Sequence, residues 1–236
     1  DSLPNILLKN CATALSVPLS NIFDTSFKDN CLPVSWKLAH VIPKHKKGGT
    51  SDPNNFRPIS LTSTCCRVME RIINNKLIEF LLECNLISRH QHGFIRKRTT
   101  DTNLLECLYD WTINLQSREV TDVIYFDFKK AFDSVSHLKL SSKLQAYGIT
   151  GNLLAWINNF LSNRTQKVKI NNTLSHIVEV SSGVPQGIVL GPTLFLIFIN
   201  DVCDIFNNLT VSCKLYADDI KLYSCYDTKA SINDLS

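Results

Sequence analysis

Two adjacent carboxylates, Asp218 and Asp219, follow Tyr216 and Ala217 in a short stretch between two apolar runs. These runs predict two strands, with the carboxylates at a tight hairpin turn. Neighbouring side chains point to opposite faces of a strand, but at a turn both can approach one point. Two anions held that close repel each other unless a divalent cation neutralises them, and Mg²⁺ prefers such oxygen ligands. The alternative is an ordinary surface turn, because Asp is common in turns.

A further carboxylate, Asp127, ends an apolar strand predicted over residues 122–127. Such a strand carries the charge to the rim of a sheet, where it can join the first two carboxylates around two metal ions. Two metals about 3.5–4 Å apart clamp the attacking and leaving oxygens of an in-line phosphoryl displacement. The alternative is a helix start, with Asp133 or Ser134 as the N-cap of a following helix. That alternative suits Asp133 but leaves Asp127 unexplained.

A loop rich in glycine and proline spans residues 183–187, with the sequence Gly-Val-Pro-Gln-Gly. Its glycines let the backbone approach a ligand closely, and its proline restricts the chain. Gln186 offers both a hydrogen-bond donor and an acceptor from this loop. Taken alone, the segment fits equally well as a connection into a buried helix.

Together, the three blocks resemble motifs A, B and C of a reverse transcriptase, and more closely those of non-LTR (LINE-type) retrotransposons. Motifs A, B and C correspond to residues 126–133, 183–187 and 216–219. Upstream blocks support the resemblance in the same order. Residues 35–48 and 55–61 are similar to two fingers motifs, and residues 91–94 with 98–100 are similar to the block before motif A.

The resemblance implies catalytic roles by position. Asp127 and Asp218 are the expected principal ligands of two Mg²⁺ ions, for which Mn²⁺ can substitute, and Asp219 is the expected third carboxylate. The implied activity is RNA-directed DNA synthesis, in which a primer 3′-hydroxyl attacks the α-phosphate of a bound dNTP. The implied partners are an RNA template, a DNA primer and dNTPs, with no membrane and no specific protein partner.

The resemblance also implies a nucleotide site. Phe132 matches the aromatic gate that excludes a ribose 2′-hydroxyl, and Ala131 lies beside it against the incoming nucleotide. Gln186 matches a residue that contacts this nucleotide and positions its sugar. Lys44 and Arg57 match fingers cations that clamp the triphosphate, a task that suits an ammonium and a guanidinium fork. The residues expected near template and primer are Gly183, Pro185, Gly187, Tyr216 and Arg98.

The fold implied by the resemblance is α+β, a right-hand polymerase without a thumb. Residues 1–120 would form the fingers and N-terminal helices, and residues 121–236 a palm with an RRM-like antiparallel sheet packed on helices, truncated after motif C. Hydrophobic spacing predicts helices over residues 3–28, 67–83, 101–117, 137–147, 151–162 and 191–205. Strands are predicted over residues 41–43, 57–61, 122–127, 167–170, 177–180, 210–216 and 220–224. The predicted buried face of helix 67–83 carries Val68, Ile72, Ile73, Leu77 and Phe80.

Composition is consistent with this interpretation. The chain has 236 residues, 44% of them hydrophobic, which is enough for a buried core in one domain with two lobes. It starts at Asp1 rather than Met, which predicts a fragment of a longer product. The net charge of +4 is modest, but basic residues cluster within residues 37–47 and 96–98, where nucleic-acid backbone would lie. Nine cysteines without C-x-x-C spacing predict buried, reduced thiols.

The sequence has no signal peptide and no apolar stretch long enough to span a bilayer. We therefore expect an intracellular protein that is not secreted, and the resemblance implies the nucleus with a cytoplasmic phase. Two alternatives stay open: a non-catalytic nucleic-acid-binding fragment or inactive relic of such an element, and a group II intron maturase-type reverse transcriptase. Salt-sensitive binding to template–primer without extension would distinguish a binding fragment from an enzyme.

Overall fold

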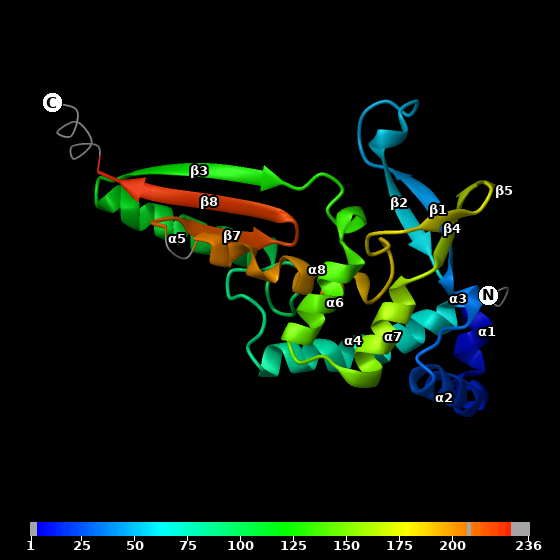
Figure 1. Ribbon diagram of the computed structural model, residues 1–236. Helices are drawn as coiled ribbons and strands as arrows, with labels where there is room; N and C mark the ends of the chain where they lie inside the picture. Colours follow the sequence, from blue (N-terminus) through cyan, green and yellow to red (C-terminus); the bar gives the residue numbers. More distant parts are fainter. Residues whose placement is uncertain (1–3, 207–208, 228–236) are drawn as a thin grey trace. The chain divides into compact units, whose positions relative to one another are not determined.

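The computed structural model describes residues 4–206 and 209–227 (Figure 1). The chain divides into two compact units, which we describe separately. The first unit comprises residues 1–80 and 132–194, and the second comprises residues 81–131 and 195–236. Helices and both antiparallel and parallel strands are present, which confirms the predicted α+β class.

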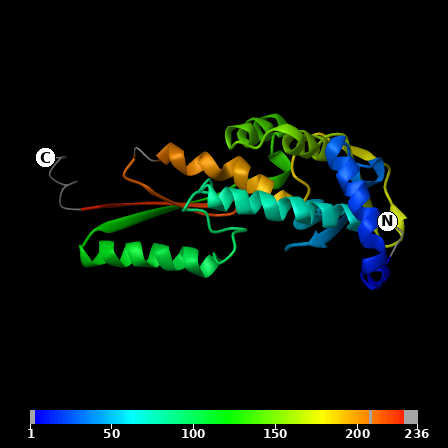
Figure 2. The same ribbon diagram turned by 90° about the horizontal axis from the view of Figure 1, so that it is seen from below.

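The second unit is built on an antiparallel sheet with the strand order β3-β8-β7. Its strands are β3 (Val120–Asp127), β8 (Asp219–Tyr226) and β7 (Ser212–Tyr216). Helix α5 (Thr100–Gln116) lies on one face, and the 3-10 segment η3 (Asn200–Phe206) lies on the other, as seen edge-on in Figure 2. The predicted antiparallel sheet packed on helices is therefore present.

Alternation along β8 directs its buried side chains to two different packed faces of this sheet. Ile220 and Leu222 belong to an apolar cluster toward η3, whose other buried members are Cys203, Cys213 and Leu215. On the opposite face, the Tyr223 ring packs edge-on against Trp111 of α5, with 5.9 Å between the ring centroids. A one-residue slip would exchange the two faces, so this burial specifies the strand register.

The start of α5 is fixed by a reciprocal pair of hydrogen bonds. The Thr99 hydroxyl accepts a hydrogen bond from the backbone N–H of Thr102, and the Thr102 hydroxyl accepts one from the backbone N–H of Thr99. Such a capping box satisfies two N–H groups that have no partner within the helix. It places the start of the helix at Thr100, one residue before the predicted start.

The first unit contains a second sheet, with the order β2-β1-β4-β5 and β6 paired to β4. Its strands are β1 (Leu38–His45), β2 (Phe56–Leu61), β4 (Arg164–Ile170), β5 (Thr173–Leu174) and β6 (Val178–Val180). The predicted hairpin of residues 167–170 with 177–180 was wrong in its pairing. The turn at Asn171 leads into β5, and β6 pairs with the first residues of β4. The parallel pairing of β1 with β4 was not predicted.

Helices and 3-10 segments complete the chain, and several correct the predicted boundaries. They are α1 (Asn5–Asn10), α2 (Ala12–Lys28), α3 (Val34–Lys37), η1 (Pro53–Asn55), α4 (Thr64–Glu83), η2 (Phe132–Ser134), α6 (His137–Ala146), α7 (Gly151–Leu161) and α8 (Gly191–Ile199). The helix predicted over residues 3–28 is interrupted at Cys11, where ψ is 15°. The N-cap of α6 is Ser136, whose hydroxyl accepts from the Lys139 N–H, and not Asp133 or Ser134, the alternative considered above.

The buried face of α4 differs from the predicted one. Val68 and Ile72 are 45% and 54% exposed, because they face the open side of a groove lined by α1 and α2. Ile73 and Leu77 are buried as predicted, whereas Phe80 is exposed, and the buried face also includes Met69 and Glu70. The ionisable residue Glu70 therefore occupies a core position of an amphipathic helix.

Glu70 is fully buried and is held by backbone donors. Its Oε2 accepts hydrogen bonds from the N–H groups of Val189, at 2.8 Å, and Leu190, at 3.1 Å. Burial raises the pKa of this carboxyl group, although the two backbone hydrogen bonds act in the opposite direction. The carboxylate thereby satisfies the backbone just before α8.

Glu70→Ala should lower the free energy of unfolding by about 2–3 kcal/mol, because it leaves two buried N–H groups without an acceptor. Glu70→Gln keeps an acceptor oxygen and should cost about 1 kcal/mol or less. Urea unfolding of the chain measures both. Glu83→Ala, at an exposed position of the same helix, is the control and should change stability by less than about 0.5 kcal/mol. Equal effects at positions 70 and 83 would contradict this account.

Among helices in the described ranges, none combines the length and apolar character needed to cross a membrane. The cysteines are all free, but they are not uniformly buried. Cys31, Cys84 and Cys225 are exposed, which corrects the prediction of buried thiols at those positions.

Candidate active site

Strands β3 and β8 bring two of the predicted carboxylates into register. Asp127 and Asp219 are directly paired at the end of this ladder. Residues paired in this way project to the same face, with Cβ atoms about 4.5–5.5 Å apart. Like charges placed directly opposite each other destabilise a sheet. The structure therefore juxtaposes Asp127 and Asp219 as predicted, in an arrangement that favours a compensating cation.

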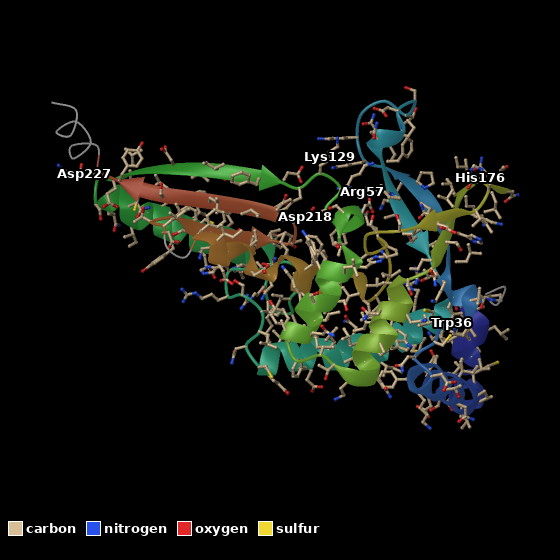
Figure 3. All side chains as sticks on the ribbon, in the orientation of Figure 1. Trp36, Arg57, Lys129, His176, Asp218 and Asp227 are labelled. Carbon is tan, nitrogen blue, oxygen red and sulfur yellow. The ribbon has the colours of Figure 1, made fainter. Side chains whose placement is uncertain are left out.

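The third carboxylate, Asp218, lies in the turn that joins β7 to β8. Tyr216 pairs with Asp219, which leaves Ala217 and Asp218 as a two-residue turn. Figure 3 labels Asp218 at this turn, at the end of the sheet where β3 also ends. Ala217 has a φ of +57°, a conformation that favours glycine and that costs a residue with a Cβ about 1–3 kcal/mol. The backbone beside Asp218 is therefore strained.

Residues 90–93 lie beside β7, where Gln91 forms an isolated parallel bridge with Leu215. The Leu215 N–H donates to the His90 carbonyl at 2.9 Å, and the His92 N–H donates to the Leu215 carbonyl at 2.9 Å. Gly93 approaches the turn so closely that a Cβ added to it would lie 2.2 Å from the Ala217 nitrogen. The block that precedes motif A in sequence therefore packs directly against the turn carrying Asp218.

Polar side chains of α5 attach this helix to the same strand. The Glu106 carboxylate lies 2.7 Å from the Lys214 ammonium and 3.4 Å from Nε2 of His92. The Asn103 side chain donates to the Leu215 carbonyl at 3.2 Å. Burial lowers the pKa of His92, although Glu106 acts in the opposite direction, so the imidazole favours its neutral form. This network supports β7 from the α5 side.

Arg98 contributes to the support of the 90–93 segment. Its Nη1 donates to the backbone carbonyls of Ser88, at 3.1 Å, Arg89, at 3.2 Å, and Gln91, at 2.5 Å. The resemblance placed Arg98 near template or primer, whereas the structure shows this nitrogen bound to the protein backbone. A guanidinium presents several donors in a fixed fork, which suits such a bracing role.

In the first unit, β1 and β2 pair two predicted nucleotide-binding cations. Lys44 and Arg57 are directly opposite each other in this ladder, and both are exposed. Figure 3 labels Arg57 on β2. Two cations placed face to face repel each other, and a phosphate group between them would relieve that repulsion.

The loop of residues 183–187 connects two other predicted site residues within the first unit. The Val184 N–H donates to the Phe132 carbonyl at 2.8 Å, and the Ser60 N–H donates to the Gln186 carbonyl at 2.7 Å. Gly183 has a φ of +86° and approaches the backbone of Asp133. The structure therefore brings Phe132 and Gln186 to one loop, which also contacts β2. Pro185 and Gly187 complete this loop, and Ala131 is a buried residue of the second unit.

Residues 42–233 match the family described as reverse transcriptase (RNA-dependent DNA polymerase). The chain belongs to this family. It is 29% identical over 234 residues to a probable RNA-directed DNA polymerase from transposon BS of Drosophila melanogaster, covering 94% of this chain and 25% of that protein. It is 32% identical to the RNA-directed DNA polymerase from the mobile element jockey of Drosophila melanogaster, covering 78% of this chain and 20% of the relative. These relatives confirm the resemblance to non-LTR retrotransposons, and the chain spans a fifth to a quarter of their length.

Solved structures of telomerases share the fold. A telomerase from Candida tropicalis, truncated from its C-terminal domain, matches with a TM-score of 0.59 at 12% identity over 94% of this chain and 50% of that chain. A telomerase from Candida albicans in complex with a TWJ fragment of telomeric RNA matches with a TM-score of 0.56 at 16% identity, over 92% and 43% of the two chains. At these identities the likeness is one of fold, and it confirms the right-hand polymerase class.

Reverse transcriptases depend in general on divalent metal ions, and the carboxylates of this chain suit such an ion chemically. Asp127, Asp218 and Asp219 offer oxygen ligands, which Mg²⁺ prefers. The directly opposed Asp127 and Asp219 provide a structural reason for a cation at this edge. Within residues 4–206 and 209–227, no three His, Cys, Asp or Glu side chains are already gathered in an arrangement that could hold an ion. The donor set therefore fits, and the structure assigns no ion position.

The sequence patterns did not indicate the roles of Gln91 and Glu70. Gln91 lies in the block before motif A, but nothing in its local pattern indicates what its side chain binds. Glu70 lies in an amphipathic helix, where its charge predicts an exposed position. Both make hydrogen bonds to backbone that is distant in sequence, so local periodicity carries no signal for their roles.

Proposed function

We propose that this chain is the polymerase core of an RNA-directed DNA polymerase of a non-LTR retrotransposon. Asp127, Asp218 and Asp219 would hold two Mg²⁺ ions at the end of the β3-β8-β7 sheet. The observation that carries this proposal is the direct pairing of Asp127 with Asp219 beside the turn that contains Asp218. When bound, the ions would lower the pKa of the attacking hydroxyl and stabilise the leaving pyrophosphate.

The reaction class is nucleotidyl transfer. The primer 3′-hydroxyl loses its proton to solvent as its oxygen forms a bond to the α-phosphorus of a dNTP. The bond from that phosphorus to the bridging oxygen breaks, and pyrophosphate leaves. The contribution of the carboxylates is to fix the site of charge neutralisation, and positioning supplies much of the rate. An RNA template, a DNA primer and dNTPs are the proposed partners, with template binding supported by family membership.

The proposed nucleotide-binding residues of the first unit are Lys44, Arg57, Phe132 and Gln186, and the resemblance alone adds Ala131. Lys44 and Arg57 would bind the triphosphate, which explains why two exposed cations face each other across β1 and β2. Phe132 would exclude a ribose 2′-hydroxyl, and Gln186 would contact the sugar. The residues proposed near template and primer are Gly183, Pro185, Gly187, Tyr216 and Arg98.

We also propose which residues form the fingers and the palm, and where in the cell the reaction takes place. Residues 1–120 would serve as fingers with N-terminal helices, and residues 121–236 as palm. The similarity to non-LTR elements supports a nuclear site of action with a cytoplasmic phase. These assignments concern the full-length protein that contains this chain.

Primer extension tests the proposed function. The full-length protein is incubated with an RNA template, an annealed DNA primer and dNTPs, with either Mg²⁺ or EDTA. We expect template-directed products with Mg²⁺ and none with EDTA. Salt-sensitive binding of template–primer without extension would overturn the enzymatic proposal in favour of a nucleic-acid-binding protein.

Phe132→Val should raise the incorporation of rNTPs relative to dNTPs by about tenfold or more, a change of about 1.4 kcal/mol in discrimination. The smaller side chain leaves room for a 2′-hydroxyl. The ratio of kcat/KM for dNTP and rNTP in the full-length protein measures this change. Phe80→Val, the same substitution on α4, is the control and should leave the ratio unchanged. Unchanged selectivity in Phe132→Val would remove Phe132 from the gate role.

A further inference from the structure

The Gln91 side chain is buried against the turn that carries Asp218. Gln91 is 1% exposed. Its Oε1 accepts hydrogen bonds from the N–H groups of Gly93, at 2.7 Å, and Ala217, at 2.8 Å, and its Nε2 donates to the Ala217 carbonyl at 3.2 Å. The amide therefore contacts both the N–H and the carbonyl of one turn residue.

The residue that the Gln91 amide binds, Ala217, has a strained backbone conformation. Ala217 has its φ at +57°, and such strain persists where surrounding groups over-determine the backbone. The Gln91 amide supplies a donor and an acceptor in fixed geometry to the two peptide groups that flank the Ala217 Cα. Because the peptide after Ala217 leads directly into Asp218, fixing it restricts the direction of the Asp218 side chain.

Gln91 is itself held in place by the rest of the second unit. Its backbone carbonyl accepts a hydrogen bond from Nη1 of Arg98, and its neighbours His90 and His92 are hydrogen-bonded to Leu215 of β7. The side chain therefore extends from a segment that is tied to the same strand as the turn. A displacement of Gln91 relative to Ala217 would break several hydrogen bonds together.

We propose that Gln91 is a positioning residue for the catalytic turn, whose side-chain amide holds Ala217 in its left-handed conformation and thereby orients Asp218. This inference rests on the proposed function for the role of Asp218. A purely structural amide would stabilise the second unit without affecting catalysis specifically. Loss of a positioning amide should change the turn and kcat, whereas loss of a purely structural amide should weaken the whole unit.

Hydrogen exchange of the 236-residue chain tests the contact without any activity. Gln91→Met keeps the approximate length of the side chain and removes its hydrogen bonds to Ala217 and Gly93. We expect exchange of the amides within residues 213–220 to become about tenfold faster, while the amides of α5 stay protected. Gln116→Met, the same substitution at an exposed position, is the control and should change nothing. Unchanged exchange at residues 213–220, or a uniform loss of protection, would overturn the proposal.

Steady-state kinetics of the full-length protein test the consequence. We expect Gln91→Met to lower kcat by about 10²-fold, the effect of a small misplacement of a catalytic group, while the dNTP KM stays within about twofold because the proposed dNTP contacts are unaltered. The Mg²⁺ concentration for half-maximal rate should rise. A kcat equal to that of Gln116→Met, or a loss confined to KM, would overturn the inference. An inactive unmodified protein would instead refute the proposed function.

Discussion

Replacing Asp218 by Asn in the full-length protein should abolish Mg²⁺-dependent primer extension, with a fall in kcat of at least about 10³-fold. The substitution keeps the size of the side chain and removes its negative charge. An amide oxygen is a poor substitute for a carboxylate at a site that neutralises a divalent cation. Extension of a labelled DNA primer on an RNA template, followed over time, measures the loss.

Two controls distinguish the loss of the Asp218 charge from a general disturbance of the fold. Asp24→Asn is the same substitution at an exposed position of α2, and it should leave kcat within about twofold. Template–primer binding by the Asp218 variant should be preserved, because affinity comes mainly from phosphate contacts elsewhere. Mg²⁺-dependent synthesis by Asp218→Asn at the unmodified rate would refute the assignment of Asp218.

Gly93→Ala should be among the most destabilising substitutions in the second unit. The added Cβ would lie 2.2 Å from the Ala217 nitrogen and 2.8 Å from the Ala217 Cα. Both atoms belong to the backbone, so no rotamer change relieves the overlap, and residues 90–93 must separate from β7. We expect the free energy of unfolding to fall by about 3 kcal/mol, the upper range for overpacking. Urea unfolding of the 236-residue chain measures this change.

Gly49→Ala provides the matched comparison for this prediction. A Cβ at that position would meet its nearest neighbour, the Ser51 hydroxyl oxygen, at 3.7 Å, an ordinary van der Waals distance. Stability should then change by about 0.5 kcal/mol or less. If Gly93→Ala were as stable as Gly49→Ala, the close approach between the 90–93 segment and the turn would be disproved.

The elements around the carboxylates could be predicted because their signals are local. The apolar run ending at Asp127 gave a strand, and the two runs around residues 216–219 gave a hairpin. Both elements are present, with β3 ending at Asp127 and β8 beginning at Asp219. The pairing of β3 with β8, which places Asp127 opposite Asp219, is a long-range contact that these local signals do not specify.

Long-range contacts could not be predicted in the same way. The pairing of β1 with β4 joins strands that are distant in the chain, and alternation within each strand does not reveal its partner. Glu70 is buried because Val189 and Leu190 offer donors from another segment, although its charge favours a surface position. Gln91 likewise binds Ala217 through an amide whose partner depends on tertiary packing. The roles of Glu70 and Gln91 can be assigned only when the backbone groups to which they are hydrogen-bonded are known.

The pairing of β1 with β4 also has a consequence for the order of folding. During synthesis, Leu38 leaves the ribosome long before Thr165, its partner in the parallel ladder. All of residues 81–131, which belong to the second unit, are translated in between. High contact order of this kind slows folding, because a long loop must close before its contacts form. The nascent first unit must therefore wait, with one side of β1 unpaired, until the chain beyond residue 164 has emerged.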